Sequence, residues 1–226
     1  MRDWNWGGIV RGILFETSIW DSTPLQNYLK DHVQTPKRDF IYGLVEMGSG
    51  KYVTLNQNEP MDRYMKGIMG SAAFPGILNA INKLDEGKVY LDGGVAYTLD
   101  IASAINHCKA KGFKESQITV DVIKCSGATF RVDDSSEYKT IKMGLRYLEI
   151  RNFYSGMDIV IRALASFKDV NFRYIIAPTT KLETGIVPFN FDPVEIEHNI
   201  QSGIRDAKAA ISLGSGKSFD MLIDYT

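Results

Sequence analysis

The apolar positions of the chain follow two periods, that of an amphipathic helix and that of a strand. Helical spacing is found over residues 20–33, 59–74, 98–112, 137–167 and 192–211. Strand patterns are found over residues 38–47, 51–57, 89–91, 117–125 and 172–178. Because strands alternate with helices, the pattern predicts an α/β domain with a largely parallel sheet and helices on both faces.

Local signals refine several of these elements. Gly48, Ser49 and Gly50 separate two strand patterns and predict a hairpin. The helical pattern over 137–167 predicts two helices, separated around Ser155 and Gly156. The last helix is expected to bury an apolar stripe made of Ile196, Ile200, Ile204, Ala207 and Ile211. Residues 211–226 are expected to form a C-terminal tail.

Composition narrows the class of protein. Lysine and arginine number 26 against 27 acidic residues, which argues against nucleic acid as a partner. No apolar run approaches the ~18 residues of a membrane span. The two cysteines, Cys108 and Cys125, lie in apolar sequence and are predicted to be reduced core residues of an intracellular, cytoplasmic protein. Cysteine and histidine spacing indicates no metal site and no cofactor.

One short stretch suggests chemistry. In "GKVYLDGGVAYTLDIASAI", residues 87–105, the strand ends on Asp92, Gly93 and Gly94, and a helix follows. In parallel sheets, reactive groups collect at the carboxyl ends of strands. An Asp-Gly pair is also a common turn signal, so the motif alone fits a simple turn as well.

The surrounding sequence resembles the patatin-like phospholipase family. "GSAAFPG", residues 70–76, followed by Asp92-Gly93-Gly94 looks like the family's second catalytic block. "SIWDSTPLQNYL", residues 18–29, is similar to its Tyr-Asp-x-x-Pro-Leu segment, and "FDPVEIEHNIQSGIRDA", residues 191–207, resembles its last helix. The similarity runs over about residues 12 to 210 and implies a three-layer sandwich with a mostly parallel central sheet.

The resemblance also implies a reaction. Patatin-like enzymes cleave acyl esters with a serine–aspartate dyad and without histidine or metal. Asp92 would be the base, and Gly93 and Gly94 would let the backbone turn sharply and leave room for the serine hydroxyl. Burial at a strand tip is one way to make a carboxylate a stronger base. The expected substrate is a phospholipid or acylglycerol, with peripheral contact to a membrane or lipid droplet.

The nucleophile is missing from this chain. None of its serines lies in Gly-x-Ser-x-Gly, the family's nucleophile motif. In the family that motif precedes the Tyr-Asp-x-x-Pro-Leu segment, so the chain is expected to be an N-terminally incomplete patatin-like domain over residues 1–210. Either the reading frame continues upstream of Met1 or the segment has been lost. Without the serine, the chain itself is expected to be inactive.

Three hypotheses remain open from the sequence. The chain is part of a patatin-like lipid acyl hydrolase, a non-catalytic patatin-like remnant that binds lipid or protein, or an unrelated α/β domain whose Asp-Gly-Gly is a turn. The oligomeric state is not predicted.

Overall fold

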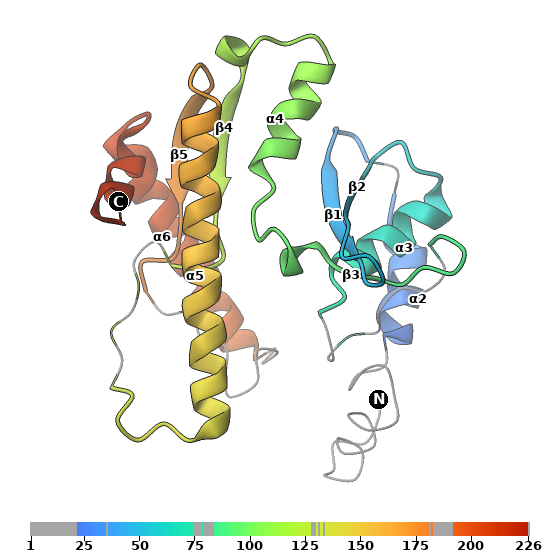
Figure 1. The fold of residues 1–226 in the computed structure, drawn as a ribbon, viewed down its shortest axis with the longest axis horizontal. Coiled ribbons are helices and arrows are strands. Elements are labelled where there is room, and N and C mark those ends of the chain that lie inside the picture. The colour runs from blue at the N-terminus through green and yellow to red at the C-terminus, as the bar shows by residue number, and fades with distance from the viewer. Residues whose placement is uncertain are drawn as a thin grey trace. The chain divides into compact units, whose positions relative to one another are not determined.

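The computed structural model describes residues 22–34, 36–74, 78, 84–127, 130, 132, 134–180, 182 and 192–225 (Figure 1). The chain divides into two compact units, Met1–Ala104 and Ile105–Thr226. Their boundary falls inside helix α4 (Ile101–Ala110). The prediction of an α/β protein is confirmed.

The first unit is built on an antiparallel sheet. Strands β1 (Ile41–Glu46) and β2 (Tyr52–Asn56) form the predicted hairpin, and Gly50 in its turn has a φ of 69°. Strand β3 (Tyr90–Asp92) pairs with the other edge of β1, also antiparallel, with Leu44 opposite Asp92. The sheet order is therefore β2-β1-β3.

Two helices accompany this sheet. Helix α3 (Met61–Ser71) buries Tyr64, Gly67, Met69 and Gly70. The hydrophobic core of the sheet consists of Leu44, Leu55, Leu84 and Tyr90. Helix α2 (Thr23–His32) has proline in its first turn, as its sequence predicts, but none of its own residues is buried.

The second unit contains the parallel pair β4 (Thr119–Ile123) and β5 (Asn171–Ile176). Helix α5 (Thr140–Ser166) runs along the strands, and its N-terminal half extends past their ends (Figure 1). Helix α6 (Pro193–Leu213) contacts β5 and begins at Asp192, whose carboxylate accepts hydrogen bonds from the N–H groups of Val194 and Glu195. The buried apolar side chains of this unit include Val122, Phe153, Met157, Val160 and Ile175.

The single, mostly parallel sheet expected from the sequence is not what the described strands form. They make two separate sheets, of which only the β4–β5 pair is parallel. The short hairpin turn makes β1 and β2 antiparallel. Strand β3 pairs with the other edge of β1 and is also antiparallel to it. Strand β4 also buries only alternate positions, so it is not covered equally on both faces.

Two helical predictions need correction, and the C-terminal tail packs on the second sheet. Residues 140–166 form one helix that continues through Ser155 and Gly156. Gly156 does not interrupt the helix and is buried. Helix α6 contacts β5 and buries the small residues Ser202 and Ala210. In the expected stripe, Ala207 is partly buried, and the four isoleucines are exposed, namely Ile196, Ile200, Ile204 and Ile211. The last segment, η3 (Lys217–Tyr225), packs on β5: the Ser218 hydroxyl accepts a 2.9 Å hydrogen bond from Ile175 N–H.

Both cysteines are free thiols. Cys108 is partly buried, but Cys125 is exposed, so the prediction that Cys125 is a core residue is wrong. Cys125 lies two residues beyond the end of β4, where the chain leaves the sheet. Within the described ranges, no helix is long and apolar enough to span a bilayer.

Candidate functional site

Asp92 is the last residue of β3, at the carboxyl end of the strand, as its sequence predicts. Its side chain is partly buried. One carboxylate oxygen, Oδ1, accepts a 2.7 Å hydrogen bond from Gly94 N–H and thereby caps the 3₁₀ turn η1 (Gly93–Val95). The other oxygen, Oδ2, has no hydrogen-bond partner among the described residues and is available to a further group.

The segment that resembles the first half of the patatin block lies beside Asp92. The backbone N–H of Asp92 donates to the carbonyl oxygen of Ala73 at 3.2 Å. Ala73 lies just beyond the end of α3, and α3 contacts β3. The two blocks, 70–74 and 92–94, are therefore neighbours in space as well as parts of one sequence motif. Pro75 and Gly76 lie outside the described residues.

Gly93 is required by a close backbone contact. A Cβ atom at this position would lie 2.4 Å from the carbonyl oxygen of Gly43 in β1, well inside van der Waals distance. The position that a side chain at residue 93 would occupy is therefore filled by β1. A Cβ at Gly94 would meet only the Asp92 carboxylate, at 3.0 Å.

An aromatic cluster closes the other side of Gly43. The Tyr52 ring lies against Gly43, and its hydroxyl donates to Asp100 Oδ2 at 2.8 Å. Burial raises the pKa of Tyr52, and the hydrogen bond to Asp100 raises it further, so the phenol stays protonated. Tyr97 meets the Tyr52 ring edge to face, with centroids 4.8 Å apart. This cluster holds the turn after Asp92 against the hairpin.

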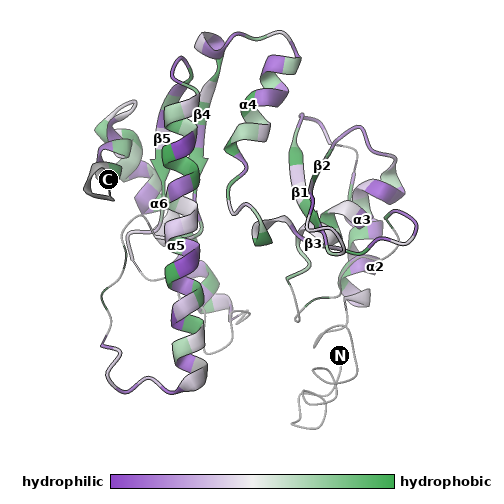
Figure 2. Ribbon diagram, viewed as in Figure 1, coloured by the Kyte–Doolittle hydropathy of each residue, from purple (hydrophilic) through white to green (hydrophobic). Residues whose placement is uncertain are grey.

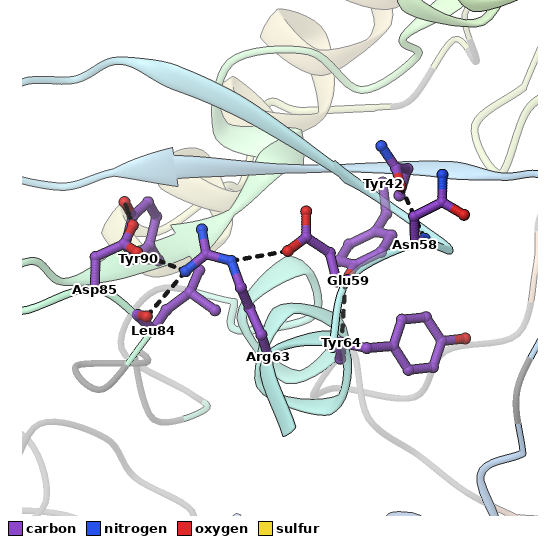
Figure 3. Close-up of polar contacts among 9 residues, drawn as sticks. Tyr42, Asn58, Glu59, Arg63, Tyr64, Leu84, Asp85 and Tyr90 are labelled. Carbon is purple, nitrogen blue, oxygen red and sulfur yellow. Dashed lines mark hydrogen bonds and ion pairs between the residues drawn. The ribbon is translucent and has the colours of Figure 1, made fainter. Parts of the chain in front are cut away.

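Arg63 of α3 fixes the start of β3 (Figure 3). Its guanidinium donates to Asp85 Oδ1 at 2.5 Å and to the Leu84 carbonyl at 3.0 Å, and it pairs with Glu59 at 3.0 Å. Tyr90 of β3 donates its hydroxyl to the other Asp85 oxygen. Arg63 thus links the helix before the motif to the strand that ends in Asp92.

Hydrogen bonds and burial in this cluster shift the pKa values of its carboxyl and phenol groups. The hydrogen bond from Arg63 holds the pKa of the Asp85 carboxyl below its usual value, and the bond from Tyr90 adds to this. Burial raises the pKa of Tyr90 to about 12, with Asp85 contributing. Burial likewise raises the pKa of Tyr42 to about 12; its hydroxyl donates to the Tyr64 carbonyl (Figure 3). None of these phenols is poised to act as a base at neutral pH.

In the described part of the chain, no nucleophilic side chain is hydrogen-bonded to Asp92. No serine hydroxyl in it forms a hydrogen bond with the carboxylate. Nor does any group of three or more histidine, cysteine, aspartate or glutamate side chains within the described ranges lie close enough together to hold a metal ion.

Exposed apolar side chains flank the motif in sequence. Phe74, Val95 and Tyr97 are each about half exposed, at 47%, 48% and 49%. Phe74 comes directly after Ala73, which bonds to Asp92, and Val95 closes the turn that Asp92 caps. The surroundings of the motif can therefore contact an apolar ligand.

Sequence reasoning missed three charged residues, Arg63, Asp85 and Lys124. The Arg63–Asp85 bond joins residues far apart in the sequence, although the i,i+4 spacing of Glu59 and Arg63 indicated part of the cluster. In the second unit, Lys124 is 5% exposed, and its ammonium contacts Met157 Sδ at 3.0 Å and faces the Phe153 ring. Burial lowers the pKa of Lys124. The apolar strand pattern around Lys124 gave no signal that its amine is buried.

Comparison with protein-family models finds no match for this chain, and comparison with curated proteins finds none either. The patatin-like assignment therefore stays a prediction based on the motifs.

Proposed function

We propose that this chain carries the general base of a patatin-like lipid acyl hydrolase. Asp92 is the proposed base, and the nucleophilic serine comes from outside the 226 residues, which contain no Gly-x-Ser-x-Gly. The substrate is an acyl ester of a phospholipid or acylglycerol, in an intracellular setting. In this proposal the two described sheets belong to a larger three-layer sandwich.

The observation that supports this proposal is the junction between the two motif blocks. The Asp92 N–H to Ala73 carbonyl bond joins them, and Gly94 N–H fixes one oxygen of the carboxylate. A base must be held in one orientation, with a lone pair free for the proton that it takes. Asp92 meets both requirements, because Oδ1 is anchored and Oδ2 has no partner in the described residues.

The proposed chemistry is a two-step acyl transfer. Asp92 takes the proton of the serine hydroxyl while the serine oxygen attacks the ester carbonyl carbon, and the proton then passes to the departing alcohol. Water next attacks the acyl-serine, gives a proton to Asp92, and releases the fatty acid as the serine recovers that proton. The neutral phenols of Tyr52 and Tyr90 do not compete for this role.

A second candidate function is a lipid-binding domain without catalysis. The half-exposed Phe74, Val95 and Tyr97 favour it, since they offer an apolar surface next to the motif that needs no nucleophile. The capping bond from Gly94 also gives Asp92 a structural role of its own.

Activity measurements separate the two functions. The DNA upstream of Met1 is sequenced, and any longer in-frame product is expressed beside the 226-residue chain and assayed with a fluorogenic acyl ester and a fluorophosphonate probe. The hydrolase proposal expects activity and labelling only in the longer product, and Asp92→Asn should lower kcat on the order of 10⁴-fold. The control Asp31→Asn, at an exposed position of α2, should leave kcat unchanged.

Two results would contradict the proposal. If no upstream frame contains a Gly-x-Ser-x-Gly, the nucleophile has no source and the lipid-binding function takes its place. If the longer product is active and Asp92→Asn retains that activity, Asp92 is a turn residue and another group is the base.

A further inference from the structure

The N-terminal half of α5, residues 140–154, exposes an unusual amount of apolar surface. Figure 2 shows hydrophobic residues along this part of the helix. Met143, Tyr147, Ile150 and Tyr154 are spaced at four, three and four residues and so share one face. Their side chains are 59%, 63%, 37% and 58% exposed. Leu145 and Leu148 are also exposed, but they lie on the opposite side of the helix.

A basic strip lies on the neighbouring face of the same turns. Lys139, which caps α5, and Lys142 and Arg146 are spaced at three and four residues. Arg146 packs over the Phe130 ring and pairs with Glu149. Lys139 and Lys142 are exposed, and the Lys142 ammonium lies over the Tyr138 ring. Arg151 is a further exposed cation. Glu149 is the single acidic residue between 139 and 154, and Asp134 and Glu137 lie exposed just before the helix. Cations therefore border the face made by Met143, Tyr147, Ile150 and Tyr154 on both of its flanks.

Helix α6 offers a comparison within the same unit. Its exposed stripe, Ile196, Ile200, Ile204 and Ile211, is similarly apolar. Its first turns, however, carry Glu195 and Glu197. An anionic surface would repel the start of α6 and attract the start of α5. The two helices expose similar apolar stripes, but they differ in the charge beside them.

We propose that the N-terminal half of α5 is a docking element for a bilayer that contains anionic phospholipids. Interfacial helices combine an apolar face, which enters the boundary between headgroups and acyl chains, with lysine and arginine beside it. Each cation near an anionic leaflet strengthens binding, and salt weakens that contribution. This inference goes beyond the function proposed for Asp92, because it holds whether or not the chain takes part in hydrolysis.

Vesicle co-sedimentation of the full chain tests the docking surface. Binding should be strong to vesicles of phosphatidylcholine with phosphatidylserine, weak to phosphatidylcholine alone, and reduced by salt. Lys139→Glu with Lys142→Glu should lower the partition coefficient roughly tenfold or more. Met143→Ser with Tyr147→Ser should lower it on both kinds of vesicle, since less apolar area is buried. All four positions are exposed, so circular dichroism should show an unchanged fold.

The matched control is on α6. Ile200→Ser with Ile211→Ser removes side chains of similar exposure, 51% and 52%, and should leave binding unchanged. Equal binding to both vesicle types, no binding, or equal loss in the α5 and α6 variants would overturn the proposal. A dimer in light scattering that the α5 variants dissociate, without vesicle binding, would assign the surface to a second copy of the chain instead. No outcome depends on ester hydrolysis, so failure here is distinct from failure of the Asp92 proposal.

Discussion

The close packing around Asp92 restricts which residues can be substituted. Gly93 faces the Gly43 backbone, and a Cβ there would lie 2.4 Å from the carbonyl oxygen and 2.5 Å from the carbonyl carbon. Because backbone rather than a flexible side chain occupies the space, β3 and β1 would have to move apart. We therefore expect Gly93→Ala to lower the free energy of unfolding by about 2 kcal/mol, measured by urea denaturation.

Gly144 provides the control for this substitution. It lies in the exposed first turns of α5, and a Cβ atom added there would meet nothing within 4 Å. Gly144→Ala should stabilise the helix by about 0.5–1 kcal/mol, since glycine costs helix propensity. If both substitutions have the same small effect, the contact between Gly43 and Gly93 tolerates a methyl group and does not restrict position 93.

Among the elements, the Arg63–Asp85 pair joins α3 to the segment before β3, and Tyr90 of β3 donates to the same carboxylate. The pKa of Asp85 is lower in the folded protein than in the unfolded chain, because Arg63 and Tyr90 donate to its carboxylate. The pair therefore stabilises the fold above the ordinary pKa of aspartate, and this contribution is lost as the pH falls through the folded-state pKa. The link between α3 and the segment before β3 should therefore weaken in acid.

Asp85→Asn measures this contribution. At neutral pH the variant should be less stable than the natural chain by about 1 kcal/mol, a modest value because both side chains are about one-third exposed. The difference should shrink as the pH is lowered below about 4. Urea midpoints taken across this range give the result. A difference that stays constant with pH would mean that Asp85 acts through packing and not through its charge.

The elements also show which features a sequence can predict. The β1–β2 hairpin and the Asp192 cap of α6 were predictable, because the residues that cause them are adjacent in the chain. The pairing of β3 with β1 depends on residues about 45 positions apart, and no local pattern encodes it. The apolar pattern of α6 predicts that its isoleucines are buried, but Ser202 and Ala210 are the residues that it buries.

In the candidate site, too, local features were predictable from the sequence and contacts between distant segments were not. The sequence places Asp92 correctly at the end of a strand, because an apolar run followed by Asp-Gly-Gly is a local signal. Its contacts with Ala73 and the support from Gly43, Tyr52 and Arg63 come from segments brought together only by folding. Burial of Lys124 is hidden for the same reason, since its neighbours Phe153 and Met157 lie on a different element.

At the scale of the whole molecule, each compact unit has buried residues of its own. Leu44 is fully buried in the first unit and Val160 in the second. We expect the units to lose structure separately, as domains with their own cores do. Leu44→Ala should destabilise the first unit by about 2–5 kcal/mol and reduce hydrogen-exchange protection there, while Val160→Ala should act on the second. Loss of protection in both units from either substitution would instead identify one cooperative fold.

The paired glycines also define a way to recognise relatives of this chain. A side chain at position 43 would collide with Tyr52, and one at position 93 would collide with the backbone of position 43. During divergence, glycine at 93 is expected to persist as long as β3 pairs with β1, whereas position 43 can gain a side chain only together with a smaller residue at 52. Relatives with low overall sequence identity should therefore still share three features. These are a glycine in the first strand, an aromatic residue across the hairpin, and an Asp-Gly at the end of the third strand.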